Sequence, residues 1–557
     1  MARILLKAQG IRKAYGEREL LRLDTLEIRE GERIGLIGAN GAGKSTLLAL
    51  LAGETEPDAG TVERGGSVAW IRQQGRADRA EDPRLRTRYR APEERDGLSG
   101  GEETRRRIAA ALSEHAELLL ADEPTSDLDE AGIALLREEL RGYPGAWVLV
   151  SHDRTLLRAL CGRIWLLEDG KILDFPGGYD AMEAERQRRR EFAQFEYEQY
   201  RREQARLEES ARRAAERASQ VRKAPSRMGN SEARLHKREA TDAVLRLSHT
   251  QRTIRNRMEQ MEVKDRPRED PQIRMQMGVA HAIGARTALE VRCERLSAGD
   301  TPLLEETAFT LPTGSRTALL GPNGCGKSTL MSVLCGQAGP EVRWQGSVRW
   351  NPQARLGWFD QHHSRTLRMD WTVLENVTAE SVLPEHQART VLRRLGFSRE
   401  DCFKRTELLS GGERAKAALA RLLLLDCNVL LLDEPTNYLD VFTLEALESL
   451  LAAWAGTLLV VSHDETFVGK TANRLLRVAD RRIQVYEGTV TEERRDLEAA
   501  KTDQELRLAR TGLEMRLAAL AARLAAPRKG DRPEQLNEEY LELARQLREL
   551  KKTSLPS

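Results

Sequence analysis

Residues 38–46 read GANGAGKST, and residues 321–329 read GPNGCGKST. Each stretch follows a short apolar run, RIGLI at 33–37 and TALL at 317–320, and each precedes a second apolar run. This pattern is typical of a phosphate-binding loop between a buried strand and a helix, because its glycines let backbone N–H groups close around a phosphate. The two matches therefore predict an α/β fold with two nucleotide-binding domains.

The two loops belong to a larger internal repeat. LSGGE occurs at 98–102 and 409–413, DEPT at 122–125 and 433–436, and VSHD at 150–153 and 461–464. These three motifs recur at a constant offset of 311 residues, whereas the loop lysines are 283 residues apart. The second copy thus has 28 more residues between its loop and LSGGE. A constant offset over several motifs indicates a duplicated domain.

The composition excludes several classes of protein. The chain has 557 residues, 32% of them charged, and a net charge of +2, so a nucleic-acid surface must be a local patch. No apolar run approaches the ~18 residues of a membrane span, and the start, MARILLKAQG, lacks the apolar core of a secretory signal. The six cysteines form no CxxC pair, which argues against a zinc ribbon and favours a reduced, cytoplasmic compartment.

Composition and apolar spacing divide the rest of the chain. Residues 183–262 are rich in Arg, Glu, Gln and Ala, which predicts a long helix, a crossing near Pro225 and Gly229, and a second helix at 231–261. After residue 491, leucines at alternating spacings of three and four predict a small antiparallel coiled coil. A simple helical cap is as good an interpretation of that tail as a binding role. The expected domains are 1–180, a helical linker at 181–285 with its tip at about 219–238, 286–490, and an extension at 491–557.

The repeated motifs carry residues suited to hydrolysis of a nucleoside triphosphate. A loop lysine can contact the β- and γ-phosphates, and the following serine can supply a hydroxyl to Mg²⁺. The first acid of DEPT can hold Mg²⁺ through water, and the second can polarise the attacking water. The pairs of residues expected in these roles are Lys44 and Lys327, Ser45 and Ser328, Asp122 and Asp433, and Glu123 and Glu434.

The ordered set of phosphate loop, LSGG, DEPT and a following histidine resembles an ATP-binding-cassette ATPase, present twice. In that family two cassettes enclose two ATP molecules head to tail, so the resemblance implies an intramolecular cassette dimer that is a monomer away from its partner. It also implies that LSGG of each copy completes the site of the other. Ser410, Gly411 and Gly412 would complete the site of Lys44, and Ser99, Gly100 and Gly101 that of Lys327.

The resemblance assigns further roles by position. His152 and His463 match the switch histidine that contacts the γ-phosphate and join the two glutamates as catalytic residues, while Gln73 and Gln361 match a glutamine that senses Mg²⁺. The complete set expected to hold ATP is Tyr15, Gly38, Asn40, Gly41, Gly43, Lys44, Ser45, Thr46, Gln73, Ser99, Gly100, Gly101, Asp122, Gly321, Asn323, Gly324, Gly326, Lys327, Ser328, Thr329, Gln361, Ser410, Gly411, Gly412 and Asp433. The metal set is Ser45, Gln73, Asp122, Ser328, Gln361 and Asp433.

Two departures from the family pattern bear on the sites. Tyr15 matches the aromatic residue that stacks on adenine, but the second copy has Ala298 at that position. Stacking on a base is worth on the order of 1–3 kcal/mol, so the second adenine should be held differently or more weakly. The Asn-His dipeptide common after DEPT is replaced by residues 126–127 (SD) and 437–438 (NY). Both water-polarising glutamates are present, so both sites are expected to hydrolyse ATP.

Two cassettes, a helical linker and no membrane domain resemble the ABC-F group over essentially the whole chain. Members bind the ribosomal E site, and their linker reaches toward the P-site tRNA and the peptidyl transferase centre. A short interval between Gln73 and LSGGE and the tail at 491–557 favour the branch of Vga- and VmlR-like antibiotic-resistance proteins. A housekeeping translation factor for stalled or initiating ribosomes, and a Uup-like DNA-associated ATPase, are the alternatives.

The tip of the linker supports an RNA partner on physical grounds. Residues 217–238 contain seven basic side chains and one acidic one, a net charge of +6. Such a patch suits a phosphate backbone, although charged helix ends are often merely solvated. The expected contacts to rRNA or tRNA are Arg222, Lys223, Arg227, Arg234, Lys237 and Arg238. The sequence thus predicts a cytoplasmic ATPase that displaces drugs from the peptidyl transferase centre and is released by ATP hydrolysis.

Overall fold

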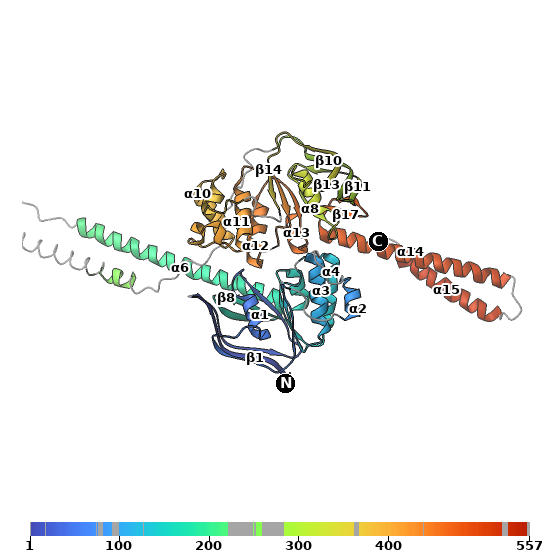
Figure 1. The fold of residues 1–557 in the computed structure, drawn as a ribbon, viewed down its shortest axis with the longest axis horizontal. Helices are drawn as coiled ribbons and strands as arrows, with labels where there is room; N and C mark the ends of the chain where they lie inside the picture. Colours follow the sequence, from blue (N-terminus) through green and yellow to red (C-terminus); the bar gives the residue numbers. More distant parts are fainter. Residues whose placement is uncertain are drawn as a thin grey trace, which may run out of the picture. The chain divides into compact units, whose positions relative to one another are not determined.

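The computed structural model (Figure 1) describes residues 2–16, 18–73, 75, 82–91, 100–125, 127–220, 249, 252–258, 283–360, 367–437, 439–525 and 533–553. The chain forms two compact units. The first unit comprises Met1–Arg88, Arg106–Pro124 and Arg137–Arg274, and the second comprises Tyr89–Arg105, Thr125–Leu136 and Met275–Ser557. None of the helices in the described ranges combines the length and the apolar character needed to cross a membrane.

The first unit is built on a six-stranded sheet with the order β5-β6-β7-β3-β8-β9. Its neighbouring strands are parallel except for the antiparallel pair of β8 and β9. A three-stranded antiparallel sheet has the order β2-β1-β4. The elements of the first sequence copy are β1 (Ile4–Tyr15), β2 (Arg18–Arg29), β3 (Arg33–Gly38), α1 (Lys44–Ala52), β4 (Ala59–Arg64), β5 (Val68–Ile71), α2 (Pro83–Arg88), α3 (Gly100–Ser113), β6 (Leu118–Asp122), α4 (Glu130–Gly142), β7 (Ala146–Val150), α5 (Arg154–Leu160), β8 (Arg163–Glu168), β9 (Lys171–Pro176) and α6 (Gly178–Gln220). The first residues of α3 and α4 belong to the second unit.

Apolar runs form the central strands because both faces of the six-stranded sheet are covered. Every residue of β6 and β7 is buried. Strands buried on both faces read as continuous apolar runs rather than as alternating patterns. Since the side chains of β3, β6 and β7 pack into one core, the ends of these strands are held in fixed positions. The phosphate loop follows β3, and DEPT begins at the end of β6.

The second unit repeats this arrangement. Its six-stranded sheet has the order β14-β15-β16-β12-β17-β18, and its three-stranded sheet the order β11-β10-β13. The elements are β10 (Thr287–Ala298), β11 (Thr301–Pro312), β12 (Arg316–Leu320), α8 (Lys327–Leu334), β13 (Val342–Trp350), β14 (Leu356–Phe359), α9 (Val373–Thr378), α10 (Glu385–Arg394), η2 (Asp401–Phe403), η3 (Thr406–Leu408), α11 (Gly411–Leu424), β15 (Val429–Asp433), α12 (Val441–Ala453), β16 (Thr457–Val461), α13 (Glu465–Thr471), β17 (Arg474–Ala479), β18 (Arg482–Tyr486), α14 (Val490–Ala525) and α15 (Pro533–Thr553).

The two units differ between the strand after the phosphate loop and the LSGG helix. In the second unit α9, α10, η2 and η3 occupy this interval and pack against α11 in a common core. The longer interval counted in the sequence is therefore a small helical subdomain. The prediction of an α/β fold with two cassettes is confirmed.

Two long helical regions are visible in Figure 1. Helix α6 has 43 residues, and ion pairs one turn apart, such as Arg189 with Glu185 and Arg213 with Glu209, line its surface. Most of the predicted second linker helix lies outside the described residues, but 252–258 is helical and Arg257 lies 3.4 Å from Glu203 of α6. At the other end of the chain, α14 and α15 pack side by side.

Candidate nucleotide-binding sites

The first phosphate loop joins β3 to α1 and is already shaped around its lysine. Gly43 precedes α1 with φ = 104°, a conformation that L-residues rarely adopt. A Cβ atom there would lie 3.0 Å from Cγ of Leu20, so a side chain at this position would strain the backbone and also displace Leu20. The Nζ atom of buried Lys44 donates to the carbonyl oxygens of Gly38 (2.8 Å) and Ala39 (3.1 Å). The ammonium group thus lies inside the loop, where phosphate oxygens can replace the carbonyls.

The second loop has the same geometry. Gly326 precedes α8 with φ = 97°, and a Cβ there would lie 2.9 Å from Cβ of Leu303. The Nζ atom of Lys327 donates to the carbonyl oxygens of Gly321 (2.8 Å) and Pro322 (3.0 Å). Both loops therefore present a buried cation at the start of a helix, which suits a polyphosphate anion.

In the first unit, two acidic residues lie where β6 ends. Burial raises the pKa of Asp122, and a hydrogen bond from Ser45 opposes that rise. The pairing of a hydroxyl with a carboxylate matches the pair expected to hold Mg²⁺, since hard oxygen donors are what this ion prefers. Glu123 follows with φ = 48°, and its N–H donates to the carbonyl of Val150 on β7 (3.0 Å).

Glu123 is paired with the histidine that follows β7. Oε1 of Glu123 lies 2.9 Å from Nε2 of His152. Burial alone would raise the pKa of Glu123, but the charge and the hydrogen bond of His152 outweigh it and hold this pKa below its ordinary value. The carboxylate is therefore ionised at neutral pH, as a general base must be.

The matching residues of the second unit have a different electrostatic balance. Burial raises the pKa of Asp433 to about 6. Burial, reinforced by Asp433, raises the pKa of Glu434 to about 7. Burial, reinforced by Lys327, lowers the pKa of His463 to about 4, and Nε2 of His463 lies 3.4 Å from Oε1 of Glu434. At neutral pH His463 is therefore uncharged, and the pKa of Glu434 is shifted in the opposite direction to that of Glu123.

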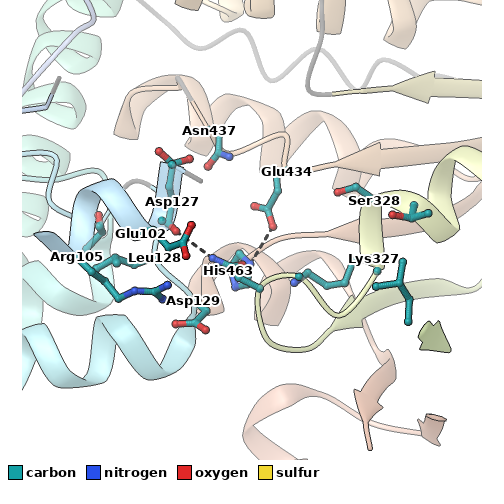
Figure 2. A pocket seen from close by; sticks show the side chains of 18 of the residues that line it. Glu102, Arg105, Asp127, Leu128, Asp129, Lys327, Ser328, Glu434, Asn437 and His463 are labelled. Carbon is teal, nitrogen blue, oxygen red and sulfur yellow. Dashed lines mark hydrogen bonds and ion pairs between the residues drawn. The ribbon is translucent and has the colours of Figure 1, made fainter. Parts of the chain in front are cut away.

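A pocket of about 660 Å³ lies in the second unit (Figure 2). One wall carries Lys327 and Ser328 of the phosphate loop, together with Glu434 and His463. The facing wall carries residues from two segments of the first sequence copy that fold with the second unit, 100–105 and 125–129. Gly100 and Gly101 are among them, so the structure brings part of the first LSGG motif into the same pocket as the second phosphate loop.

The backbone of Asp127 is in contact with the second phosphate loop and lies close to the first LSGG motif. The Nδ2 atom of Asn323 in the second loop donates to the carbonyl oxygen of Asp127 (3.0 Å). Asp127 has φ = 63°, and a Cβ atom on Gly101 would lie 2.6 Å from the same carbonyl. Asp127 was noted in the sequence only as a departure from the family dipeptide. In the structure it is the point at which the two segments and the second loop meet.

The surfaces expected to receive the bases differ. Tyr15 lies at the end of β1 with 59% of its surface exposed, and Nζ of Lys13 lies 5.9 Å from its ring centre. The second pocket has Ala298 and Leu303 at the corresponding place and no aromatic lining residue among those described. The first unit thus offers an exposed aromatic ring, and the second offers aliphatic side chains.

The remaining predicted residues fall into two groups. Gln73 is described just after β5, where its carbonyl accepts a hydrogen bond from Arg107 of α3. Ser410 caps α11, accepts from the N–H of Glu413 (3.3 Å) and donates to its carboxylate (2.7 Å), and Gly411 and Gly412 open that helix. Ser99, Gln361 and all six predicted RNA-contacting residues lie outside the described residues.

Sequence reasoning did not single out Arg105 or Asp129, which also line the pocket of the second unit. Asn437 lines it too, and the sequence marks that residue only as part of a departure from the family dipeptide. A signal was available for the first two. With the constant offset of 311 residues, Lys416 is the residue of the second copy equivalent to Arg105, and Asp440 is equivalent to Asp129. Comparing the copies position by position would have marked these charged residues for inspection.

Comparison with known proteins gives concordant matches. Residues 21–84 and 304–437 match the model of a family described as ABC transporter, and residues 165–255 match a second model with that description. The chain is 33% identical over 486 residues to the ribosome protection protein VmlR of Bacillus subtilis (strain 168), covering 86% of this chain and 87% of VmlR. It is 32% identical over 494 residues to the erythromycin resistance ATP-binding protein MsrA of Staphylococcus epidermidis, covering 85% and 97%.

Solved structures match at the level of the fold. The RNase-L Inhibitor superposes with a TM-score of 0.57 at 21% identity, covering 88% of this chain and 93% of that one. Archaeal aABCE1, solved in complex with the ribosomal stalk protein aP1, superposes with a TM-score of 0.58 at 20% identity, covering 88% and 92%. At this identity the likeness shows a shared twin-cassette architecture.

Proposed function

Because this chain belongs to the ABC-F family of twin-cassette proteins and is an ATP-hydrolysing enzyme, we propose that it protects the ribosome from antibiotics. It binds the ribosomal E site in the cytoplasm, and its linker displaces drugs from the peptidyl transferase centre. The observation that carries this proposal is the identity above 30% to VmlR and MsrA, named for ribosome protection and erythromycin resistance, over at least 85% of the chain.

The site geometry supports a role for each residue in the ATPase reaction. Lys44 and Lys327 neutralise the β- and γ-phosphates from inside their loops. Ser45 with Asp122, and Ser328 with Asp433, are the oxygen donors that would hold Mg²⁺, whose charge would offset that of the phosphates. Glu123, ionised and directed by His152, accepts a proton from the attacking water. Glu434 has the same role in the second site, with His463 contacting the γ-phosphate.

ATP binding must be coupled to ribosome binding for the cycle to work. LSGG of each copy contacts the nucleotide held by the loop of the other, so two ATP molecules favour a closed arrangement of the cassettes. The closed form presents the linker, whose basic tip at 222–238 contacts rRNA or the P-site tRNA. Hydrolysis removes the contacts that favour closure and releases the protein. Nucleotide shifts the population only because it binds the closed form more tightly than the open one.

The proposal is tested with the double variant Glu123→Gln/Glu434→Gln, which binds ATP but lacks both bases. It should co-sediment with 70S ribosomes when ATP is present and remain in the supernatant without it. The matched control is Lys44→Ala/Lys327→Ala, which should not co-sediment under either condition. Binding that is indifferent to nucleotide contradicts the proposed cycle.

Growth assays separate protection from other ribosomal roles. Expression of the wild-type chain should raise the inhibitory concentration of drugs that bind the peptidyl transferase centre. Replacing Arg222, Lys223, Arg227, Arg234, Lys237 and Arg238 with alanine should abolish this effect and leave ATP hydrolysis unchanged. ATP-dependent ribosome binding without any protection would instead identify a housekeeping translation factor. Stimulation of hydrolysis by branched DNA, lost on deletion of 491–557, would identify a DNA-associated ATPase.

A further inference from the structure

Lys416 and Asp440 form a buried ion pair in the second unit. The Nζ atom of Lys416 on α11 lies 2.8 Å from Oδ2 of Asp440, and their side chains are only 9% and 2% exposed. Oδ1 of Asp440 also accepts hydrogen bonds from the N–H and the hydroxyl of Thr443, each 2.9 Å long, at the start of α12. The charge of Lys416 is therefore satisfied inside the protein, where it ties α11 to α12.

The equivalent residues of the first copy, Arg105 on α3 and Asp129 before α4, do not form this pair. Oδ1 of Asp129 accepts a hydrogen bond from the N–H of Gly132 (3.0 Å). Within the described part of the chain, no carboxylate lies within 4.0 Å of the Arg105 guanidinium, in contrast to the Lys416–Asp440 pair. The Nε atom of Arg105 is buried and has no hydrogen-bond partner there. A guanidinium group that is partly removed from water and unpaired is costly, so an anionic partner is to be expected.

The position of Arg105 indicates which anion this is. Arg105 and Asp129 both line the pocket that contains Lys327 and Ser328, on the wall facing the phosphate loop (Figure 2). Arginine presents a rigid fork of donors that matches phosphate oxygens and keeps its charge at any physiological pH. We infer that Arg105 contacts the phosphates of the nucleotide bound in this pocket, from the side opposite Lys327. This inference rests on the proposed assignment of the pocket as a nucleotide site.

The consequence is a difference between the two ATP sites. The site of Lys327 receives a second cation, Arg105, from a segment of the other sequence copy. The equivalent residue Lys416 is paired with Asp440, so its ammonium group does not contact phosphate in the site of Lys44. The second site thereby compensates for its aliphatic base surface with an additional phosphate contact.

The test uses the variant Glu123→Gln, in which turnover reports on the site of Lys327. In this background, Arg105→Ala should raise the KM for ATP about tenfold or more, as expected for the loss of a charge-assisted hydrogen bond. The affinity for ADP should change less, and the melting temperature should stay unchanged. Arg105→Lys, which retains the charge but not the fork, should fall between. The matched control Lys416→Met should lower the melting temperature and leave the KM unaltered.

Two results would overturn the inference. One is a normal KM for Arg105→Ala with a lowered melting temperature, which would make Arg105 a structural residue. The other is that Asp129→Asn raises the KM for ATP as much as Arg105→Ala does, and that the double variant Arg105→Ala/Asp129→Asn raises it no further. That result would mean that Arg105 forms an ion pair with Asp129, as Lys416 does with Asp440.

A further variant separates this inference from the proposed site. Lys327→Ala should abolish hydrolysis in the Glu123→Gln background. If hydrolysis persists, the nucleotide site itself is misassigned and the inference about Arg105 falls with it. If hydrolysis is lost and Arg105→Ala behaves normally, only the inference about Arg105 fails.

Discussion

The Nε2 atom of His152 lies 2.9 Å from Oε1 of Glu123, and this contact keeps a buried carboxylate ionised. Burial raises a carboxyl pKa because the charged form loses hydration, while a nearby positive charge lowers it. In the first unit the effect of His152 is larger than that of burial, and the pKa of Glu123 is lowered. In the second unit the effect of burial is larger, and the pKa of Glu434 rises to about 7.

Removing the histidine should therefore move the pH dependence of the first site. In a Glu434→Gln background, His152→Ala leaves Glu123 buried without its partner, so the pKa of Glu123 rises and the base is protonated near neutral pH. The single-turnover rate at pH 7 should fall roughly 10- to 100-fold, and raising the pH should restore part of it. His463→Ala in the same background is the control and should leave the acid limb of the profile in place. An unchanged acid limb in His152→Ala would contradict this account of Glu123.

Replacing the loop lysines should remove ATP binding one site at a time. Lys44→Ala and Lys327→Ala each delete an ammonium group that the loop carbonyls hold in position. Each single variant should halve the stoichiometry of bound ATP in equilibrium dialysis, and the double variant should bind none. The exposed Lys171→Ala on β9 is the control and should bind as the wild type does. Full stoichiometry in either single variant would show that the corresponding loop is not a nucleotide site.

The two base surfaces should respond in opposite directions to exchange of their side chains. Tyr15→Ala should weaken ATP binding at the first site by on the order of 1–3 kcal/mol, the worth of a stacked base. Ala298→Tyr should strengthen binding at the second site, because it supplies the missing aromatic face. Fluorescence titration with a labelled ATP analogue, in backgrounds that retain one loop lysine, measures each effect. Tyr15→Phe is the control and should bind normally, since stacking needs the ring and not the hydroxyl.

Loss of the Asp440 carboxylate should destabilise the second unit strongly. Asp440→Ala leaves the Lys416 ammonium buried without a partner, a change that typically costs about 3–5 kcal/mol, and it also removes the cap of α12. The equivalent change Asp129→Ala removes the hydrogen bond from Gly132 and a charge that acts on His463, but it leaves no buried ammonium group unpaired, so it should cost about 1 kcal/mol. Urea unfolding, followed by tryptophan fluorescence, measures both. An equal loss of unfolding free energy in Asp440→Ala and Asp129→Ala would contradict the conclusion that only the second copy contains the buried ion pair.

Local sequence was sufficient to predict the phosphate loops and the acids that follow β6 and β15. A loop between a buried strand and a helix is built from neighbouring residues, so Gly43, Lys44 and Ser45 lie close together in any fold that keeps this pattern. The duplication, the α/β class and the choice of Glu123 and Glu434 as candidate catalytic residues follow from short motifs with constant spacing. The long helix at 178–220 was also readable, because its composition excludes a globular core.

Only the tertiary structure decided how equivalent residues are used. Arg105 and Asp129 have the same separation in sequence as Lys416 and Asp440, yet one pair is buried at 2.8 Å and the other is open to a pocket. The same holds for the second acid of each DEPT motif, because the pKa of Glu123 is lowered and that of Glu434 is raised. Burial and distance between residues far apart in the chain set these charges, and neither quantity is encoded in a motif. The sequence therefore determined which chemical groups the two sites contain, and the packing around them decided which of those groups are charged, paired or free.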